Sequence, residues 1–171
     1  MDNHNRYEKY SLWIIFLSNL VSLSIYAIGI YIVAIFGTPF LVCYLLFCGW
    51  IEMNVMRWSC RSCYYYGKVC AFGKGKLCSF LFNRKDGKEF TERKIRWYNI
   101  LPDFMVFLIP LCLGIFSLFR NFSWLIGLLL LLLLLLSFAG NAFIHGSLAC
   151  KYCKQQDMGC PALELFNKKN V

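Results

Sequence analysis

Cysteine is the residue type with the clearest chemical potential in this sequence. The chain contains ten cysteines, and six of them form two copies of the spacing C-x2-C-x6-C, placed 90 residues apart. The copies are Cys60, Cys63 and Cys70, and Cys150, Cys153 and Cys160. A C-x2-C pair lets two thiolates bind one cation, and two pairs supply the four ligands of a closed tetrahedral zinc site. The spacing therefore predicts metal binding.

The candidate ligands fit two arrangements. In a shared site, one ion is bound by Cys60, Cys63, Cys150 and Cys153. With separate sites, one ion is bound by Cys60, Cys63, Cys70 and Cys78, and another by His145, Cys150, Cys153 and Cys160. Each arrangement gives every ion four ligands, so the spacing leaves the choice open. Both predict that sulfur atoms from at least three of these cysteines lie within about 4 Å of one another.

The identity of the metal separates two classes of function. We expect zinc, and the alternative is an iron–sulfur cluster, which uses the same thiolate ligands. A zinc protein would be a binding and assembly module whose rigid cap docks a protein partner or lipid. A cluster, or a dithiol pair without metal, would make it a membrane oxidoreductase or electron-transfer subunit that exchanges electrons with quinone. The sequence has no H-E-x-x-H motif, Ser/His/Asp group or paired carboxylates, so any enzyme here would be a redox enzyme.

The composition places these cysteines in a membrane protein. The chain has 171 residues, of which 59% are hydrophobic and 16% are charged, and its mean hydropathy is +0.55. A soluble domain of this length could not bury so much apolar surface. No charged residue occurs from Tyr10 to Ile51, which is long enough for two crossings, with a break at Gly37, Thr38 and Pro39.

We expect an all-α integral membrane protein with four transmembrane helices in two hairpins. The expected helices run from Ser11 to Phe36, Pro39 to Met56, Pro102 to Phe119 and Phe122 to Gly146. A shift of 90 residues lays the first hairpin over the second, and one cysteine knuckle follows each hairpin. The hairpin and its knuckle are therefore interpreted as a repeated unit, which divides the chain into residues 1–90 and 91–171. Because each unit crosses the membrane twice, both knuckles lie on the same face.

The basic residues predict which face that is. The chain has a net charge of +9, and 17 of its 18 lysines and arginines lie before the first span, between the two hairpins or after the last span. Only Arg120 lies on the other side. The positive-inside rule then places both termini, the central loop and both knuckles in the cytoplasm, with the protein integral to the cytoplasmic membrane.

Basic residues near the first knuckle suggest a further contact with the bilayer. Lys68, Lys74 and Lys76 lie among glycines and tyrosines at the expected headgroup level, where they could bind anionic lipid headgroups, specifically or through general attraction. The same bias towards cations follows from membrane orientation alone, so we expect no nucleic acid partner.

Four polar residues occupy corresponding places near the ends of two expected spans. Glu52 and Asn54 lie near the end of the second span, and Asn141 and His145 near the end of the fourth. Polar groups at this depth often belong to functional sites, although the interface can also hydrate them.

Overall fold

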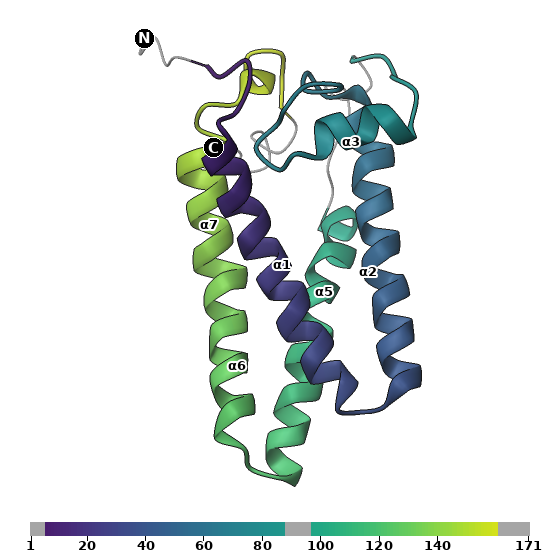
Figure 1. Ribbon diagram of the computed structural model, residues 1–171, viewed down its shortest axis with the longest axis vertical. Coiled ribbons are helices and arrows are strands. Elements are labelled where there is room, and N and C mark those ends of the chain that lie inside the picture. Colours follow the sequence, from purple (N-terminus) through teal and green to yellow (C-terminus); the bar gives the residue numbers. More distant parts are fainter. Residues whose placement is uncertain (1–5, 88–96, 161–171) are drawn as a thin grey trace.

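The computed structural model describes residues 6–87 and 97–160, and this part of the chain is all-helical (Figure 1). Four helices are long and apolar enough to cross a membrane, which confirms the expected membrane class. They are Leu12–Ala34, Thr38–Ser62, Asn99–Arg120 and Trp124–Ala149. The proposed boundary between residues 90 and 91 lies outside the described residues, as do residues 1–5 and 161–171 at the termini.

Glycine and proline separate the first two helices, as the sequence predicts. Helix α1 (Leu12–Ala34) ends before Gly37, whose φ of 109° is readily adopted only by glycine. Pro39 lies in the first turn of α2 (Thr38–Trp58). Proline lacks a backbone N–H, and in the first turn that N–H would have no hydrogen-bond partner within the helix. The resulting turn reverses the chain within a few residues.

The third span begins earlier than predicted. Helix α5 runs from Trp97 to Arg120 and contains both Pro102 and Pro110, whereas Pro102 was expected to be its first residue. A proline near a helix start is tolerated because few backbone hydrogen bonds are lost there. Pro110 is fully buried at mid-helix, where packing against neighbouring helices accommodates it.

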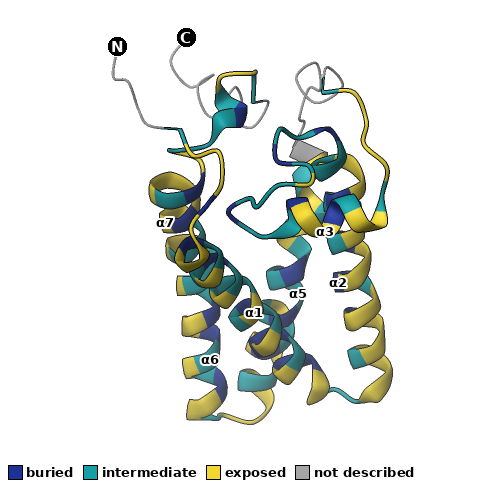
Figure 2. Ribbon diagram, turned by 45° about the horizontal axis from the view of Figure 1, so that its top comes forward, coloured by how far each residue is buried: buried dark blue, intermediate teal, exposed yellow. Residues whose placement is uncertain are grey.

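Helix α1 holds the transmembrane part together. It contacts α2, α5 and α6 (Trp124–Leu135), and in Figure 1 it crosses diagonally in front of α5, between α6 and α2. Two apolar clusters fill its contacts. One contains Ile28 and Ile32 of α1 with Leu133 of α6, and the other contains Tyr44 of α2, whose hydroxyl donates to the carbonyl oxygen of Val106 in α5 (2.7 Å). Figure 2 shows the outer helix surfaces as exposed, the pattern expected of faces that meet lipid.

The fourth span changes its helical geometry towards the end. Helix α6 passes into two π-helical segments, η2 (Leu136–Gly140) and η3 (Ile144–Ala149), with one short α-helical segment, α7 (Asn141–Phe143), between them. In a π-turn each backbone N–H bonds the carbonyl five residues earlier, so side chains five residues apart become neighbours.

Three segments far apart in the sequence form a cap at one end of the helices, at the top of Figure 1. They are residues 6–11, residues 59–87 with helix α3 (Lys74–Leu81), and residues 150–160. Their apolar core includes Tyr10, Tyr65 and Ala71, which pack with Ile144 and Ala149 of η3. The two cysteine motifs therefore lie on the same side of the bundle.

Candidate metal centre

A cavity of about 470 Å³ lies between the cap and the helices. Both cysteine motifs contribute to its wall, together with one histidine. The candidate ligands that line it are Cys60, Cys63, Cys70, His145, Cys150 and Cys153. Six of the eight residues that the sequence proposes as ligands therefore surround one space; the five cysteines belong to the cap, and His145 lies in η3.

The closest contact between two candidate ligands is produced by the π-helical turn. The backbone N–H of Cys150 donates to the carbonyl oxygen of His145 (3.0 Å), which is the i to i+5 bond of η3. The same turn brings Cys150 Sγ to 3.7 Å from His145 Nδ1. The imidazole ring also packs on the ring of Phe72, with 5.2 Å between ring centroids. The π-helical turn and the packing on Phe72 together fix the position of His145 beside Cys150.

The first motif is shaped by tight turns. Cys60 begins a 3₁₀ turn, η1 (Cys60–Ser62), and the carbonyl oxygen of Cys63 accepts a hydrogen bond from the N–H of Tyr66 (3.0 Å). Cys70 Sγ accepts a hydrogen bond from the backbone N–H of Gly75 (3.3 Å). A Cβ at Gly75 would lie 2.7 Å from the carbonyl oxygen of Lys68, so the motif needs glycine there.

Two predicted ligands do not line the cavity. Cys78 is fully buried in the cap, and its Sγ lies 3.5 Å from the carbonyl oxygen of Met56, in hydrogen-bond contact. Cys160 is half-buried at the end of the described residues. Among residues 6–87 and 97–160, no group of three or more histidine, cysteine or acidic side chains is arranged to hold a metal ion. The expected cluster of three sulfur atoms is therefore not formed in this arrangement of side chains.

Two thiols of the cavity, Cys63 and Cys150, have raised pKa values. Burial raises the pKa of Cys63 to about 11, and the nearby Cys153 and Cys70 add to this effect. Loss of water contact likewise raises the pKa of Cys150 to about 11, with further contributions from Cys153 and Cys160. Protonated thiols do not repel one another, and they are poor metal ligands until they lose their protons.

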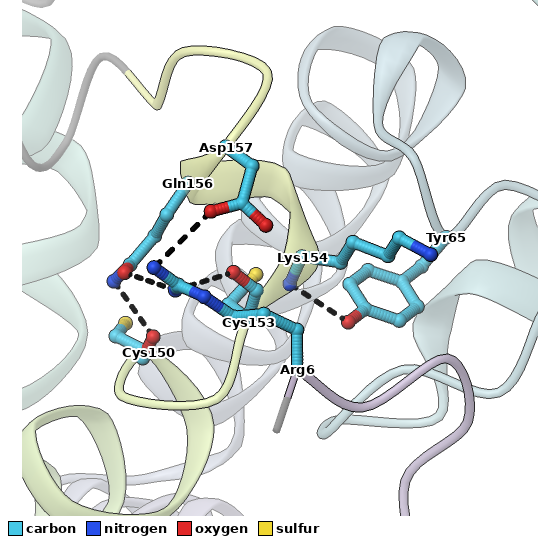
Figure 3. Close-up of polar contacts among 7 residues, drawn as sticks. All are labelled: Arg6, Tyr65, Cys150, Cys153, Lys154, Gln156 and Asp157. Carbon is cyan, nitrogen blue, oxygen red and sulfur yellow. Dashed lines mark hydrogen bonds and ion pairs between the residues drawn. The ribbon is translucent and has the colours of Figure 1, made fainter. Parts of the chain in front are cut away.

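Direct hydrogen bonds join the two motifs. The backbone N–H of Tyr64 donates to the side-chain oxygen of Gln155 (2.7 Å), and the backbone N–H of Lys154 donates to the hydroxyl of Tyr65 (3.1 Å). Figure 3 shows the second of these contacts, with the ring of Tyr65 reaching across to the turn after Cys153. The cap is thus closed by polar contacts that need no metal ion.

The N-terminal segment reinforces this connection, which the sequence did not reveal. Tyr7 forms an isolated β-bridge with Cys153, and its carbonyl oxygen accepts a hydrogen bond from the hydroxyl of Tyr65 (2.6 Å). Arg6 donates to the carbonyl oxygen of Cys153 (3.1 Å) and pairs with Asp157 (3.2 Å), as Figure 3 shows. The clustering of tyrosines before the first span and after Cys63 is the sequence signal, since a buried tyrosine seeks a partner for its hydroxyl.

The lysines near the first motif have different surroundings. Lys74 forms an ion pair with Glu52 (2.6 Å), and Glu52 also accepts a hydrogen bond from the hydroxyl of Tyr26 (2.6 Å). Lys68 lies over the ring of Tyr64, 4.0 Å from its centroid, and Lys76 is exposed.

The four polar residues near the span ends also lie close to this site. Glu52, Asn141 and His145 line the cavity, and Asn54 lines a neighbouring groove.

Comparisons with protein-family models, with curated proteins and with solved structures give no match. The function therefore has to be argued from the geometry of this site.

Proposed function

We propose that this protein binds a metal ion through thiolates at the cytoplasmic face of the membrane and acts as a binding and assembly module. The observation that carries the proposal is the contact between His145 Nδ1 and Cys150 Sγ at 3.7 Å. Nitrogen and sulfur ligands of one tetrahedral zinc ion lie about 3.6 Å apart, given bonds of about 2.1 and 2.3 Å. Two ligands of the proposed site are therefore already at the right separation.

The remaining ligands in this proposal are Cys153 and Cys63. Cys153 follows Cys150 at the C-x2-C spacing, and both line the cavity with His145. Cys63 is the most suitable fourth ligand because it also lines the cavity and because the nearby Cys153 contributes to the raised pKa of the Cys63 thiol. An inward movement of the Cys63 and Cys153 side chains would be needed to complete the tetrahedron, and Cys60 and Cys70 remain on the wall as further sulfur donors.

The contacts of the cap define what the metal would add. Hydrogen bonds already join the two motifs, so the ion would stiffen an assembled cap rather than bring its parts together. Structural zinc contributes about 10 to 16 kcal/mol in small domains. A cap made rigid in this way offers a fixed surface for a protein partner or for lipid headgroups, near Lys68 and Lys76. The repeated hairpin and the cytoplasmic orientation are part of this proposal and rest on the cysteine spacing and the basic residues.

A redox function is the second candidate, and the lining of the cavity favours it. The thiols share the cavity with apolar side chains of the membrane helices, among them Ile25, Val106 and Phe107. An iron–sulfur cluster or a dithiol pair at this position would lie within reach of a lipid-soluble electron carrier. The four cysteines Cys60, Cys63, Cys150 and Cys153 would then replace the mixed ligand set.

Metal analysis of protein purified without oxygen tests the proposal. We expect one zinc ion for each chain and no visible colour, whereas a cluster would give iron, sulfide and a broad visible absorption band. Cys63→Ser and Cys150→Ser should each abolish zinc binding. Cys112→Ser is the control, because Cys112 is exposed on α5 outside the cavity. Normal zinc content in both test variants would refute the shared site, and loss in Cys160→Ser but not in Cys63→Ser would assign the fourth ligand to Cys160.

A further inference from the structure

The cavity adjoins a second hollow on the side of the bundle. This groove has a volume of about 450 Å³ and lies between the end of α2 and the beginning of α5. Its walls include Trp50, Asn54, Trp58, Asn99 and Pro102. Four residues line both the groove and the cavity, namely Ile51, Val55, Ser59 and Asp103. These shared residues form the boundary between the two hollows, where a passage from the side of the helices to the thiols would lie.

The position of the groove makes it accessible from the bilayer. Trp50 and Trp58 are 54% and 57% exposed, and Trp58 lies near the cap end of the second span, whereas Trp50 lies at its middle. Tryptophan side chains prefer the boundary between the hydrocarbon and the headgroups. A molecule dissolved in the membrane would therefore meet the groove before it meets the cap.

The polar groups inside the cavity restrict what could bind there. Glu52 accepts hydrogen bonds from both Lys74 and Tyr26, so the charges of Glu52 and Lys74 offset each other. A lysine ammonium has three N–H donors, and the ion pair with Glu52 uses one of them. The other two suit an acceptor oxygen on a ligand. Asp103, at the passage, adds a negative charge that disfavours an anionic headgroup.

We propose that this cavity binds a membrane-dissolved molecule of the quinone class, which enters sideways between α2 and α5. Its neutral ring would carry a carbonyl oxygen to Lys74, and its apolar tail would follow the groove past Val55. The volume suits a substituted ring with a short length of chain, since ligand sites typically measure about 300 to 1,000 Å³. The ligand shares a cavity with the proposed metal centre, but its binding does not depend on the metal.

Quenching of tryptophan fluorescence tests this site in purified protein in nanodiscs. A short-chain ubiquinone analogue should quench the fluorescence saturably, because Trp50 and Trp58 line the groove. Val55→Phe, which narrows the passage, and Lys74→Met, which removes the donor, should each weaken binding about tenfold or more, equivalent to about 1.4 kcal/mol. The matched controls are Val42→Phe and Lys9→Met, since both residues are exposed and lie outside both hollows.

The outcomes separate this inference from the metal proposal. Equal quenching in Val55→Phe and Val42→Phe would overturn the lateral site, as would equally effective competition by phosphatidylglycerol vesicles, which carry an anionic headgroup. Metal content and thermal unfolding are measured on the same samples, so a variant that has merely unfolded is recognised. Saturable quenching retained in Cys63→Ser, with its metal lost, would support a ligand site that stands without the metal.

Discussion

The two cysteine motifs have the same spacing but are built on different supports. The first follows α2 and is formed by tight turns, with Gly75 of α3 packed against its backbone. The second extends from a π-helical turn, and the N-terminal segment holds it through Arg6, Tyr7 and Tyr10. The first motif thus has supports close in sequence besides its bonds to the second motif and to the N-terminal segment, whereas the second is held by residues about 140 positions away. Equal spacing does not imply equal dependence on the rest of the fold.

The largest predicted effect tests the local support of the first motif. In Gly75→Ala, the new Cβ would collide with the carbonyl oxygens of Tyr65 and Lys68, which are backbone atoms and cannot move aside independently. We expect a loss of about 3 kcal/mol or more in the free energy of unfolding, measured by denaturation in detergent. Loss of zinc binding should accompany it.

The second motif supplies the control for this substitution. Gly146 lies just before Cys150, and a Cβ there would meet no atom within 4 Å. Gly146→Ala should therefore leave stability unchanged or raise it slightly, since alanine favours helix over glycine. A similar loss of stability in both variants would show that the two motifs are packed alike, contrary to the structure.

A second prediction concerns pH and treats the two motifs as partners in one site. Because burial raises the pKa of Cys63 and of Cys150 to about 11, each thiol must release a proton when it binds zinc near neutral pH. Affinity should rise with pH, by about tenfold per unit for each thiol deprotonated, and therefore by about a thousandfold per unit for a site with three thiolates. Competition with a chelator between pH 6.5 and 8 measures this slope. A slope of two thiols, from Cys150 and Cys153 alone, would indicate that the motifs do not share the ion.

The sequence predicted the membrane helices better than it predicted the site. Long uncharged segments and the break at Gly37 and Pro39 define the spans, because hydrocarbon tolerates few alternatives to a continuous helix. The early start of α5 was missed because proline is tolerated in the first turns. The change from α-helix to π-helix after Leu135 could not be predicted, because the uniformly apolar sequence there contains no residue that marks it.

The candidate ligands were predictable only as a set of residue types. Spacing identified six residues that do line one cavity, including His145 five positions before Cys150. It could not show that Cys78 is buried away from that cavity, because its direction depends on how α3 packs below the first motif. The contacts of Tyr10 and Arg6 with the second motif were equally hidden, since no local pattern records a contact between distant segments.

A third prediction tests the distant support of the second motif. Tyr10 is 5% exposed, and its hydroxyl donates to the carbonyl oxygen of Ala149 (2.5 Å), just before Cys150. In Tyr10→Phe this carbonyl would lose its partner, at a cost of about 1 to 2 kcal/mol in the free energy of unfolding. Tyr31→Phe is the control, because Tyr31 is 48% exposed on α1, outside the cap. Equal unfolding midpoints for the two variants would show that Tyr10 does not stabilise the second motif.

The smallest predicted effect on stability concerns one arginine at each motif. Arg6 bonds the carbonyl oxygen of Cys153, whereas Arg61 bonds the carbonyl oxygen of Asn83 beside the first motif. Because both side chains are near the surface, we expect Arg6→Gln and Arg61→Gln to lower stability by about 1 kcal/mol or less.

Thiol reactivity should nevertheless distinguish the two variants. Alkylation of the metal-free protein, followed peptide by peptide with mass spectrometry, should accelerate at Cys150 and Cys153 in Arg6→Gln and at Cys60 and Cys63 in Arg61→Gln. High salt should reduce the difference for Arg6, because its ion pair with Asp157 is half-exposed and is screened. If either variant accelerated all four cysteines equally, the cap would open as one unit, and the separate supports of the two motifs would have no energetic meaning.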